Sequence, residues 1–327
     1  MQIDQSAALI IGVSGQDGAY LADLLLARGL SVHGSSRDKE SASFASLKAM
    51  GIFEGVRLHS VAPDDFRSVA AILKAVRPRY IFNLAAQSSV GLSFEQPVET
   101  IDSIMHATIT IMEAVRFLGL DSRIYNASSS ECFGNTNDKP ADETTSFSPR
   151  SPYAVGKAAA FWAVANYREA YGLFTCSGIL FNHESPMRPK RYVTQKIVHG
   201  VLDIRDRKTD ILELGSLDMS RDWGWAPEYV DAMWRMVDRD VPEDFVIATG
   251  ETHSLQDFVA AAFSAVGLDW REHVRISDAF RRPTDIIISR ANPDKAKRLL
   301  GWTAETRMFD VVEKLLAAES ARRAAAR

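Results

Sequence analysis

Residues 7–18 read Ala7-Ala8-Leu9-Ile10-Ile11-Gly12-Val13-Ser14-Gly15-Gln16-Asp17-Gly18, an apolar run that ends in a glycine-rich turn. Helical periodicity follows over residues 20–28, and a second strand-like segment occupies residues 31–36. This order predicts a strand, helix, strand unit. In such a unit the turn meets a dinucleotide pyrophosphate at the helix N-terminus, where a Cβ atom would obstruct the phosphates. We therefore predict cofactor contacts from Gly12, Gly15, Gln16, Asp17 and Gly18.

The spacing of these glycines is G-x-x-G-x-x-G and differs from the G-x-G-x-x-G of many dehydrogenases. Taken alone it is a weak signal, and a glycine turn with only a structural role is the alternative. Its position directly after an N-terminal strand favours the binding role.

The alternation of strands and helices continues along the chain. Further helices are expected at residues 69–76, 98–118 and 152–171, and further strands at 80–85, 122–127 and 174–180. This pattern predicts an α/β fold with a doubly wound parallel sheet of the Rossmann type. From Phe181 the pattern becomes irregular and rich in proline and arginine. We predict a dinucleotide-binding domain at residues 1–180, whose sheet later segments complete, and a smaller, mixed C-terminal domain at 181–327 that mainly binds the substrate.

Composition and charge narrow the class of protein. The chain has 327 residues, of which 46% are hydrophobic and 24% charged, as in ordinary globular enzymes. A net charge of -4 gives no electrostatic case for nucleic acid. Cys132 and Cys176 are too few for a disulfide framework or a four-ligand zinc site, so we expect no metal and a reducing compartment. With no basic signal region and no long apolar run, we expect a cytoplasmic enzyme without a membrane contact.

A Tyr-x-x-x-Lys motif occurs at Tyr153 and Lys157. Residues at i and i+4 share one face of a helix, and Ser151 and Pro152 are suitable N-cap and N1 residues for a helix that starts there. A lysine near a phenol favours the phenolate, and lowering a tyrosine pKa from about 10 toward 7 requires about 4 kcal/mol. We therefore expect Tyr153 to act as a base with the help of Lys157.

A second motif, Ser128-Ser129-Ser130-Glu131, follows the strand expected at 122–127. Ser129 and Glu131 stand at i and i+2, so they project to the same side if they end an extended strand. Together the two motifs supply a hydroxyl, a carboxylate, a phenol and an ammonium, which is more chemistry than a simple alcohol dehydrogenase needs. The alternative for Glu131 is a solvated carboxylate at a strand end.

The second strand ends in Ser35-Ser36-Arg37-Asp38-Lys39. At this place an acidic residue favours an unphosphorylated ribose, whereas arginine favours a 2′-phosphate. Ser36 and Arg37 therefore predict NADP as the cofactor, with NAD less favoured. Asp38 is a contrary charge, and Arg37 as a solvated loop residue is the alternative.

Several longer motifs, taken with the two above, carry a resemblance to a known family. They are Asn83-Leu84-Ala85-Ala86-Gln87-Ser88, residues 127–134, Pro149-Arg150-Ser151-Pro152-Tyr153, Gly178-Ile179-Leu180-Phe181-Asn182-His183-Glu184-Ser185-Pro186, Arg221-Asp222-Trp223-Gly224, residues 245–250 and Arg282-Pro283-Thr284-Asp285. The chain resembles the extended short-chain dehydrogenase/reductases, and within them most closely the GDP-mannose 4,6-dehydratases, nearly from end to end. The Asn-His-Glu-Ser-Pro and Arg-Asp-Trp-Gly strings are the most discriminating.

The resemblance implies that GDP-mannose is converted to GDP-4-keto-6-deoxymannose by hydride transfer from C4 to NADP and back to C6, with loss of water. Tyr153 would deprotonate the C4 hydroxyl, and Lys157 would hold the nicotinamide ribose. Ser129, at the family's threonine position, would bond the C4 oxygen, and Glu131 would remove the C5 proton. A plain reductase or a C4 epimerase needs no glutamate there.

The resemblance also implies ligand contacts beyond these four residues. Leu84 and Ala85 would contact the cofactor. The sugar nucleotide would meet Ser88, Asn182, Arg188, Lys196, Arg221, Arg282 and Asp285. The basic members suit a diphosphate, which carries about two negative charges. His183 and Trp223 are equally well explained as packing residues.

Two departures from the family's pattern affect the cofactor and the assembly. Ala62 takes the place of an aspartate that contacts adenine, and Asp64 or Asp65 is a possible substitute. Residues 37–40 replace a paired-arginine loop that helps tetramers to form, which weakens the case for a tetramer. We expect a homodimer or homotetramer, with helices 98–118 and 152–171 at the dimer interface and Phe161, Trp162 and Tyr167 as anchors.

Other functions remain open at this point. One is a dehydratase for another GDP-sugar, such as a GDP-heptose, because pocket size is not encoded in motif spacing. Another is a GDP-sugar 4-reductase or epimerase, against which Glu131 argues. A third, from a different class, is a catalytically silent nucleotide-binding or scaffold protein, which intact Ser129, Glu131, Tyr153 and Lys157 make the weakest choice.

Overall fold

The computed structural model describes residues 3–277, 279 and 283–325. The expected strand, helix, strand unit is present at the N-terminus as β1 (Asp4–Ile11), α1 (Gln16–Ala27) and β2 (Ser31–Ser36). The apolar residues of β1 are buried from Ala7 onward, which explains why this run forms a central strand.

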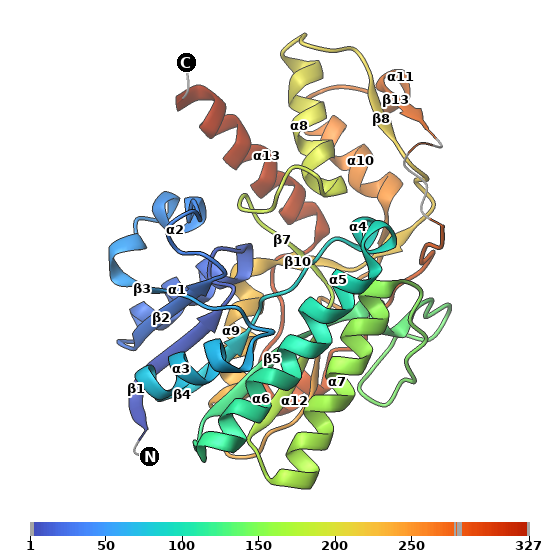
Figure 1. The fold of residues 1–327 in the computed structure, drawn as a ribbon. Helices are drawn as coiled ribbons and strands as arrows, with labels where there is room; N and C mark the ends of the chain where they lie inside the picture. The colour runs from blue at the N-terminus through green and yellow to red at the C-terminus, as the bar shows by residue number, and fades with distance from the viewer. Residues whose placement is uncertain (1–2, 278, 280–282, 326–327) are drawn as a thin grey trace.

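A seven-stranded parallel sheet forms the centre of the molecule, in the order β11-β6-β5-β4-β1-β2-β3 (Figure 1). Its other strands are β3 (Arg57–Ser60), β4 (Pro78–Asn83), β5 (Arg123–Ser129), β6 (Thr175–Leu180) and β11 (Phe245–Ile247). The strand order reverses between β1 and β4, where open α/β sheets bind their ligands at the carboxyl ends of the strands. The predicted doubly wound parallel sheet is confirmed, and β11 joins it from the C-terminal half of the chain.

Helices cover both faces of this sheet. The core on one face joins α3 (Phe66–Val76), α6 (Ala107–Leu118) and α7 (Pro152–Tyr171) to the strands. The core on the other face joins α1, α9 (Ala226–Val237) and α12 (Asp294–Leu300). The helix expected at 98–118 is instead α5 (Pro97–Ile101), a π-helical turn η2 (Asp102–His106) and α6 in succession.

One expected dimer anchor is wrong. Phe161 is buried and packs against Phe147, at a ring-centroid distance of 4.9 Å, so it is not available to a partner. Its neighbour Trp162 on α7 is 63% exposed. A helix turns its successive residues to different faces, and only structure shows which face the core takes.

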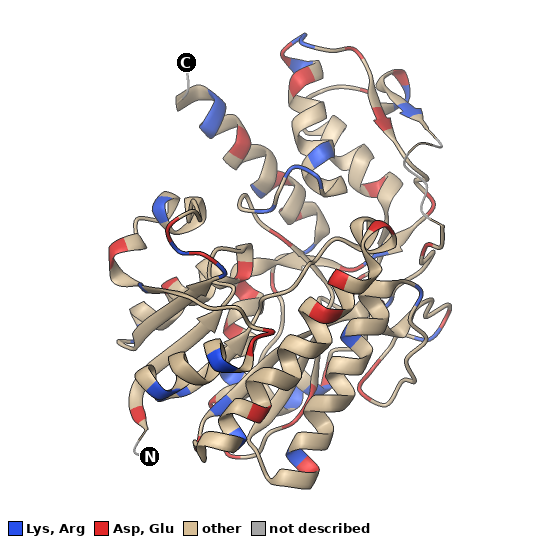
Figure 2. Cartoon of the chain, in the orientation of Figure 1, with Lys and Arg blue, Asp and Glu red and all other residues tan. Residues whose placement is uncertain are grey.

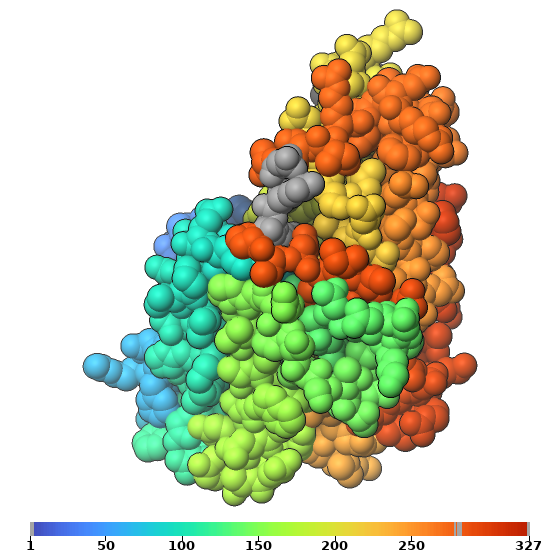
Figure 3. Space-filling view, turned by 90° about the vertical axis from the view of Figure 1, so that its right-hand side faces the viewer, coloured from blue at the N-terminus to red at the C-terminus, as the bar shows by residue number. Residues whose placement is uncertain are grey.

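The C-terminal segments form a smaller lobe, which Figure 3 shows in yellow and orange above the teal and green segments. Its core joins α8 (Val193–Arg205), α10 (Leu255–Ser264) and α13 (Met308–Ala325) through side chains such as Val198, Phe258 and Leu315. Short elements complete the chain: α2 (Ala45–Ala49), η1 (Phe53–Gly55), α4 (Val90–Glu95), η3 (Ser130–Phe133), β7 (Asn182–Glu184), β8 (Leu212–Leu214), β9 (Ser220–Arg221), β10 (Trp223–Trp225), β12 (His253–Ser254), α11 (Trp270–His273) and β13 (Val274–Ile276). Among the described residues, none of the helices has the length and apolar character needed to cross a membrane.

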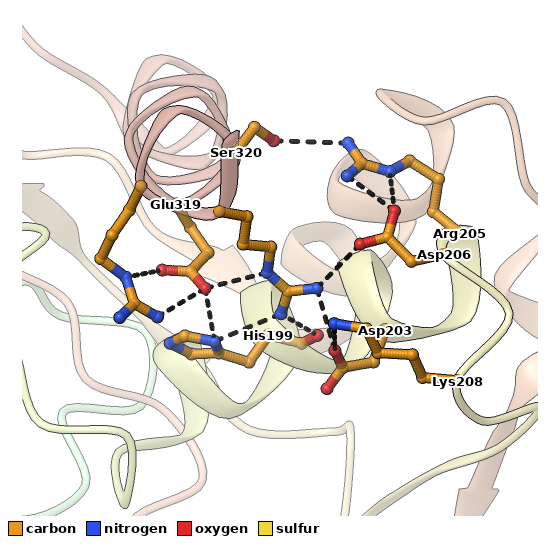
Figure 4. Close-up of polar contacts among 9 residues, drawn as sticks. His199, Asp203, Arg205, Asp206, Lys208, Glu319 and Ser320 are labelled. Atoms are coloured by element: carbon orange, nitrogen blue, oxygen red, sulfur yellow. Dashed lines mark hydrogen bonds and ion pairs between the residues drawn. The ribbon is translucent and has the colours of Figure 1, made fainter. Parts of the chain in front are cut away.

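A polar network fastens α13 to α8 (Figure 4). Glu319 lies 3.0 Å from Nδ1 of His199 and accepts hydrogen bonds from Arg322 and Arg323 at 2.6 and 2.9 Å. Arg323 also pairs with Asp203 at 2.9 Å. Figure 2 shows acidic and basic residues together along α13, and the pairs of Glu319 with Arg322 and Arg323 lie within this helix. Burial would raise the pKa of Glu319, but the hydrogen bonds from Arg322 and Arg323 lower it to about 2.

We expect Glu319→Gln to lower the melting temperature by a few degrees, because charged hydrogen bonds of this kind contribute about 1–3 kcal/mol. Glu313→Gln, an exposed position on the same helix, should change it far less. The stabilisation should be complete above pH about 4.5, the ordinary pKa, and be lost as the pH falls toward about 2. Thermal unfolding monitored by circular dichroism checks this, and equal melting temperatures for the two variants would contradict it.

Candidate active site

A cavity of about 630 Å³ lies where strands β5 and β6 end and the C-terminal lobe begins. This volume is in the range of small-molecule sites. Twelve of the predicted site residues line it together: Asp17, Leu84, Ser88, Ser129, Glu131, Tyr153, Lys157, Asn182, Arg188, Lys196, Arg221 and Asp285. The cavity is therefore built from both halves of the chain.

The remaining predicted residues lie away from the lining of this cavity. They are Gly12, Gly15, Gln16, Gly18, Ser36, Arg37 and Ala85, which belong to the β1–α1 turn and its surroundings or to the end of β2. Arg282 falls outside the described residues.

The β1–α1 turn fits a dinucleotide diphosphate. Gly12 has φ +97°, and a Cβ atom there would lie 2.8 Å from the Ala85 nitrogen. At Gly18 a Cβ atom would lie 2.6 Å from Cα of Val13, so helix and turn could not approach as they do. Among the described residues, no side chain caps the start of α1 at Gly15. The first amides of α1 are thus available to an anion, as expected of a phosphate-binding helix.

Helix α7 places Tyr153 and Lys157. Its start is fixed by Ser151, whose Oγ accepts a hydrogen bond from the Ala154 nitrogen at 3.1 Å, followed by Pro152 in the first turn. Lys157 is buried, and its Nζ donates to the Ala127 carbonyl at 2.6 Å. The same Nζ lies 5.8 Å from the centroid of the Tyr153 ring. The spacing of the motif therefore brings both groups into the cavity.

The electrostatics of Tyr153 differ from the expectation. Burial raises its pKa well above 10, although a hydrogen bond with Ser129 opposes this shift. The expected lowering of the Tyr153 pKa by Lys157 is wrong, because the ammonium donates to Ala127 and the phenol is buried. Burial also lowers the pKa of Lys157 to about 8, and the charge of Asp17 opposes that shift.

Ser129 and Glu131 line the same cavity, but they are not both on an extended strand as expected. Strand β5 ends at Ser129, and the 3-10 turn η3 begins at Ser130. Ser129 caps this turn, because its Oγ accepts a hydrogen bond from the Glu131 nitrogen at 3.3 Å. The turn, and not an extended strand, aligns the hydroxyl with the carboxylate.

On the C-terminal side, two arginines are held by carboxylates. Arg188 Nε lies 3.2 Å from Glu184 Oε2, which also accepts a hydrogen bond from Thr194 at 2.7 Å. Arg221 is 5% exposed, and its Nη2 lies 3.5 Å from Asp285 Oδ1. Each guanidinium group is thus oriented by a neighbouring carboxylate.

Tyr192 was missed by the sequence analysis. Its hydroxyl lies 2.8 Å from the Ser88 hydroxyl, and its ring lies under Arg188 with 4.0 Å between the guanidinium carbon and the centroid. It lines the cavity and immediately precedes α8. Only its position as an aromatic residue directly before a helix within an arginine-rich segment could have suggested a role.

His183 and Trp223 both line the cavity, and both also pack. Trp223 lies against Phe258 in the core of the C-terminal lobe, at a centroid distance of 5.4 Å. His183 stacks on Tyr229 at 4.5 Å and contacts Asp17. A packing role for His183 and Trp223 therefore does not exclude a position in the cavity wall.

At the adenosine end, Asp65 caps α3 by accepting a hydrogen bond from the Ser68 nitrogen at 2.7 Å. The nitrogen of Ala62 donates to the Ser68 hydroxyl at 3.0 Å. Asp38 accepts a hydrogen bond from the Glu40 nitrogen at 2.9 Å, within its own turn. Asp65 and Asp38 are therefore engaged locally, and Arg37 is exposed beside them.

Comparison with known proteins agrees with this geometry. The family model described as GDP-mannose 4,6 dehydratase matches residues 9–315. GDP-mannose 4,6 dehydratase 1 of Arabidopsis thaliana is 41% identical over 321 residues, covering 94% of this chain and 88% of the relative. GDP-mannose 4,6-dehydratase of Sinorhizobium fredii is 41% identical over 334 residues, covering 94% of this chain and 95% of the relative.

A solved structure shares the fold at lower identity. DesIV, the dTDP-glucose 4,6-dehydratase of Streptomyces venezuelae crystallised with NAD, superposes with a TM-score of 0.87 at 20% identity, covering 97% of this chain and 98% of that one. At this identity the likeness supports the fold alone. The family match and the two relatives go further, and they show that this chain belongs to the GDP-mannose 4,6 dehydratase family.

Proposed function

We propose that this protein is a lyase that converts GDP-mannose to GDP-4-keto-6-deoxymannose with loss of water. The observation that carries the proposal is the carboxylate of Glu131, which faces one cavity with Ser129, Tyr153 and Lys157. Hydride chemistry alone needs a phenol and an ammonium. A carboxylate beside them supplies the second base that water elimination requires. Membership of the family supports the same reaction.

The residues of the chain would divide the proton transfers as follows. When bound, a nicotinamide dinucleotide supplies reversible storage of one hydride. Tyr153 takes the proton of the C4 hydroxyl, and Ser129 hydrogen-bonds the C4 oxygen. Burial raises the pKa of the Tyr153 phenol, and the hydrogen bond with Ser129 opposes this shift and so favours the phenolate. The C5 proton becomes acidic once C4 is a ketone, and Glu131 removes it and gives a proton to the C6 hydroxyl, which leaves as water. C6 then receives the stored hydride, and the proton that Tyr153 took balances the one that C5 regains.

The basic side chains of the cavity would hold the GDP moiety. Arg188, Arg221 and Lys196 supply the positive charge that a diphosphate needs, and the first two are already oriented by Glu184 and Asp285. Asn182 and Ser88 would contact the sugar or its phosphate. Tyr192 would position Ser88 through the hydrogen bond between their hydroxyl groups. We assign dinucleotide binding to residues 1–180 with strand β11, and sugar-nucleotide binding mainly to residues 181–327.

The reaction is tested by incubating the purified protein with GDP-mannose and no added reductant. We expect a product lighter by the mass of one water and no net change in the cofactor spectrum. Glu131→Gln should retain GDP binding but lose about 10²- to 10⁴-fold in the rate of water loss, the usual contribution of a positioned base. Glu54→Gln, an exposed position on η1, should leave the rate unchanged.

Mass spectrometry and a kinetic assay measure both results. Normal turnover by Glu131→Gln would remove Glu131 from the mechanism. Turnover of a GDP-heptose but not of GDP-mannose would change the sugar and keep the chemistry. An altered C4 centre without loss of water would favour a reductase or an epimerase.

We infer that the cofactor is NADP. Arg37 is exposed at the end of β2, and the hydroxyl of Ser36 donates to the Asp38 carbonyl at 3.2 Å, which holds the loop in place. The carboxylate of Asp38, a charge against a 2′-phosphate, accepts a hydrogen bond within its own turn. We propose separately that the reaction takes place in the cytoplasm, the compartment that the sequence predicts.

Arg37→Ala should weaken NADPH binding about tenfold or more and leave NADH binding nearly unchanged, because a charged hydrogen bond to phosphate is lost. Arg275→Ala, an exposed arginine on β13, should affect neither cofactor. Fluorescence titration of both reduced cofactors makes the comparison. Equal affinities of the unaltered protein for NADPH and NADH would end the assignment.

We also propose a homodimer through α5, η2 and α7. Each of these elements carries exposed apolar side chains. Val98 on α5 is 66% exposed and Trp162 on α7 is 63% exposed, and Met105 on η2 and Val155 on α7 are exposed as well. Apolar side chains of this size on adjacent helices are typical of a protein interface.

Trp162→Glu should convert the dimer to a monomer, because a charge would be buried without a partner in the interface. Val241→Glu, at an equally exposed apolar position in a loop, should leave the mass unchanged. Size-exclusion chromatography with light scattering gives the mass of each. A dimeric Trp162→Glu variant would place the interface elsewhere.

A further inference from the structure

The segment that follows β6 is hydrogen-bonded to the start of α1. Gln16 and Asp17 open α1, and both bond to this segment. The Gln16 side chain donates to the His183 carbonyl at 3.3 Å and accepts a hydrogen bond from the Ser185 hydroxyl at 2.8 Å. His183 Nε2 lies 3.0 Å from Asp17 Oδ2. Two residues of the expected cofactor helix are thus tied to two residues of the substrate segment.

The partners of His183 determine where its protons lie. Nδ1 is 2.7 Å from the carbonyl oxygen of Phe181, which can only accept, so Nδ1 carries a proton. The contact between Nε2 and Asp17 then needs one more proton, on either the imidazole or the carboxyl. Burial disfavours both charges, but the mutual attraction of the pair raises the pKa of His183 and lowers that of Asp17. The pair is therefore an imidazolium and a carboxylate.

Arg188 also acts on this pair, since its charge lowers the pKa of both His183 and Asp17, but the guanidinium is itself paired with Glu184. Tyr229 from α9 stacks on the imidazole face at 4.5 Å. The His183 side chain is 9% exposed and the Asp17 side chain 22%. A partly buried ion pair of this kind is strongly destabilised when one partner is removed, because the other charge stays behind unpaired.

The position of Asp17 links the Asp17–His183 pair to binding of the dinucleotide. Its carboxylate stands in the first turn of α1, where a dinucleotide diphosphate would dock, and an unpaired carboxylate there would repel that anion. The imidazolium that neutralises it comes from the segment that carries Asn182 and Arg188, two proposed substrate contacts. Moving this segment away from α1 would expose the negative charge to the cofactor.

We propose that Asp17 with His183, supported by Gln16 with Ser185, forms a latch that couples the two ligand sites. Closure of the segment 182–188 on α1 favours the dinucleotide, and the dinucleotide in turn holds the segment in the conformation that binds the sugar nucleotide. Such a latch suits a reaction that returns the cofactor to its starting state, since the cofactor has no need to leave between turnovers. The proposal rests on the proposed function only for the identity of the two ligands. His183 and Ser185 are positioning residues in it.

The test measures binding and needs no turnover. The dissociation constant of GDP is measured by calorimetry with and without saturating NADP⁺. We expect GDP to bind at least about fivefold more tightly in the presence of NADP⁺, which is the lower range of coupling between sites. Asp17→Asn and His183→Gln should each bring this ratio close to one, and the double variant should add nothing further because both remove the same pair.

Two further variants serve as a control and as a milder test. Asp23→Asn, an exposed position on α1, should keep the ratio of the unaltered protein. Ser185→Ala removes the hydroxyl that donates to Gln16 and accepts a hydrogen bond from the Met187 nitrogen, and leaves both charges of the pair in place. It should lower the ratio partly, even if the charge variants fail to fold in a melting experiment. An unaltered protein with a ratio of one, or charge variants and Ser185→Ala that keep the full ratio, would overturn the latch. Coupling without turnover of GDP-mannose would instead leave the latch in place and refute the proposed function.

Discussion

The close approach of backbone at the β1–α1 turn is the constraint on which the site depends. Gly12 lies against the backbone of Ala85, and Gly18 lies against Val13, so neither position has space for a side chain. This contact seats the start of α1 at the point where the strand order reverses. The free amides of the first turn and the carboxylate of Asp17 consequently face the end of the sheet where the cavity opens.

From that point the cavity is organised by paired charges. Three carboxylates on or beside its lining each hold one cation: Asp17 holds His183, Glu184 holds Arg188 and Asp285 holds Arg221. Each pair joins groups that would be costly to bury alone. An incoming diphosphate therefore meets guanidinium groups with fixed positions and loses little side-chain entropy on binding. The first of these pairs also ties β7 to the start of α1, since His183 and Asp17 belong to these two elements.

The parts of the fold that the sequence predicts correctly are those set by neighbouring residues, such as helix caps. Strand β2 and helix α7 begin and end where the sequence predicts, because Ser151, Pro152 and Gly172 supply a cap at each end of α7. The π-helical turn within residues 98–118 leaves no such signal. Beyond residue 181 the strands are two or three residues long and pair across the fold, as β7 does with β10. Tyr192 and His183 likewise gain their roles only from partners far away in the sequence.

Tyr153 shows why a correct motif can carry a wrong electrostatic expectation. The i, i+4 spacing does bring Tyr153 and Lys157 to one cavity, but it does not decide which acceptor the ammonium chooses, and here that acceptor is the Ala127 carbonyl. Burial of the phenol then dominates and raises its pKa. The motif thus determines which two side chains share the cavity, whereas their burial and their hydrogen-bond partners set the pKa of each.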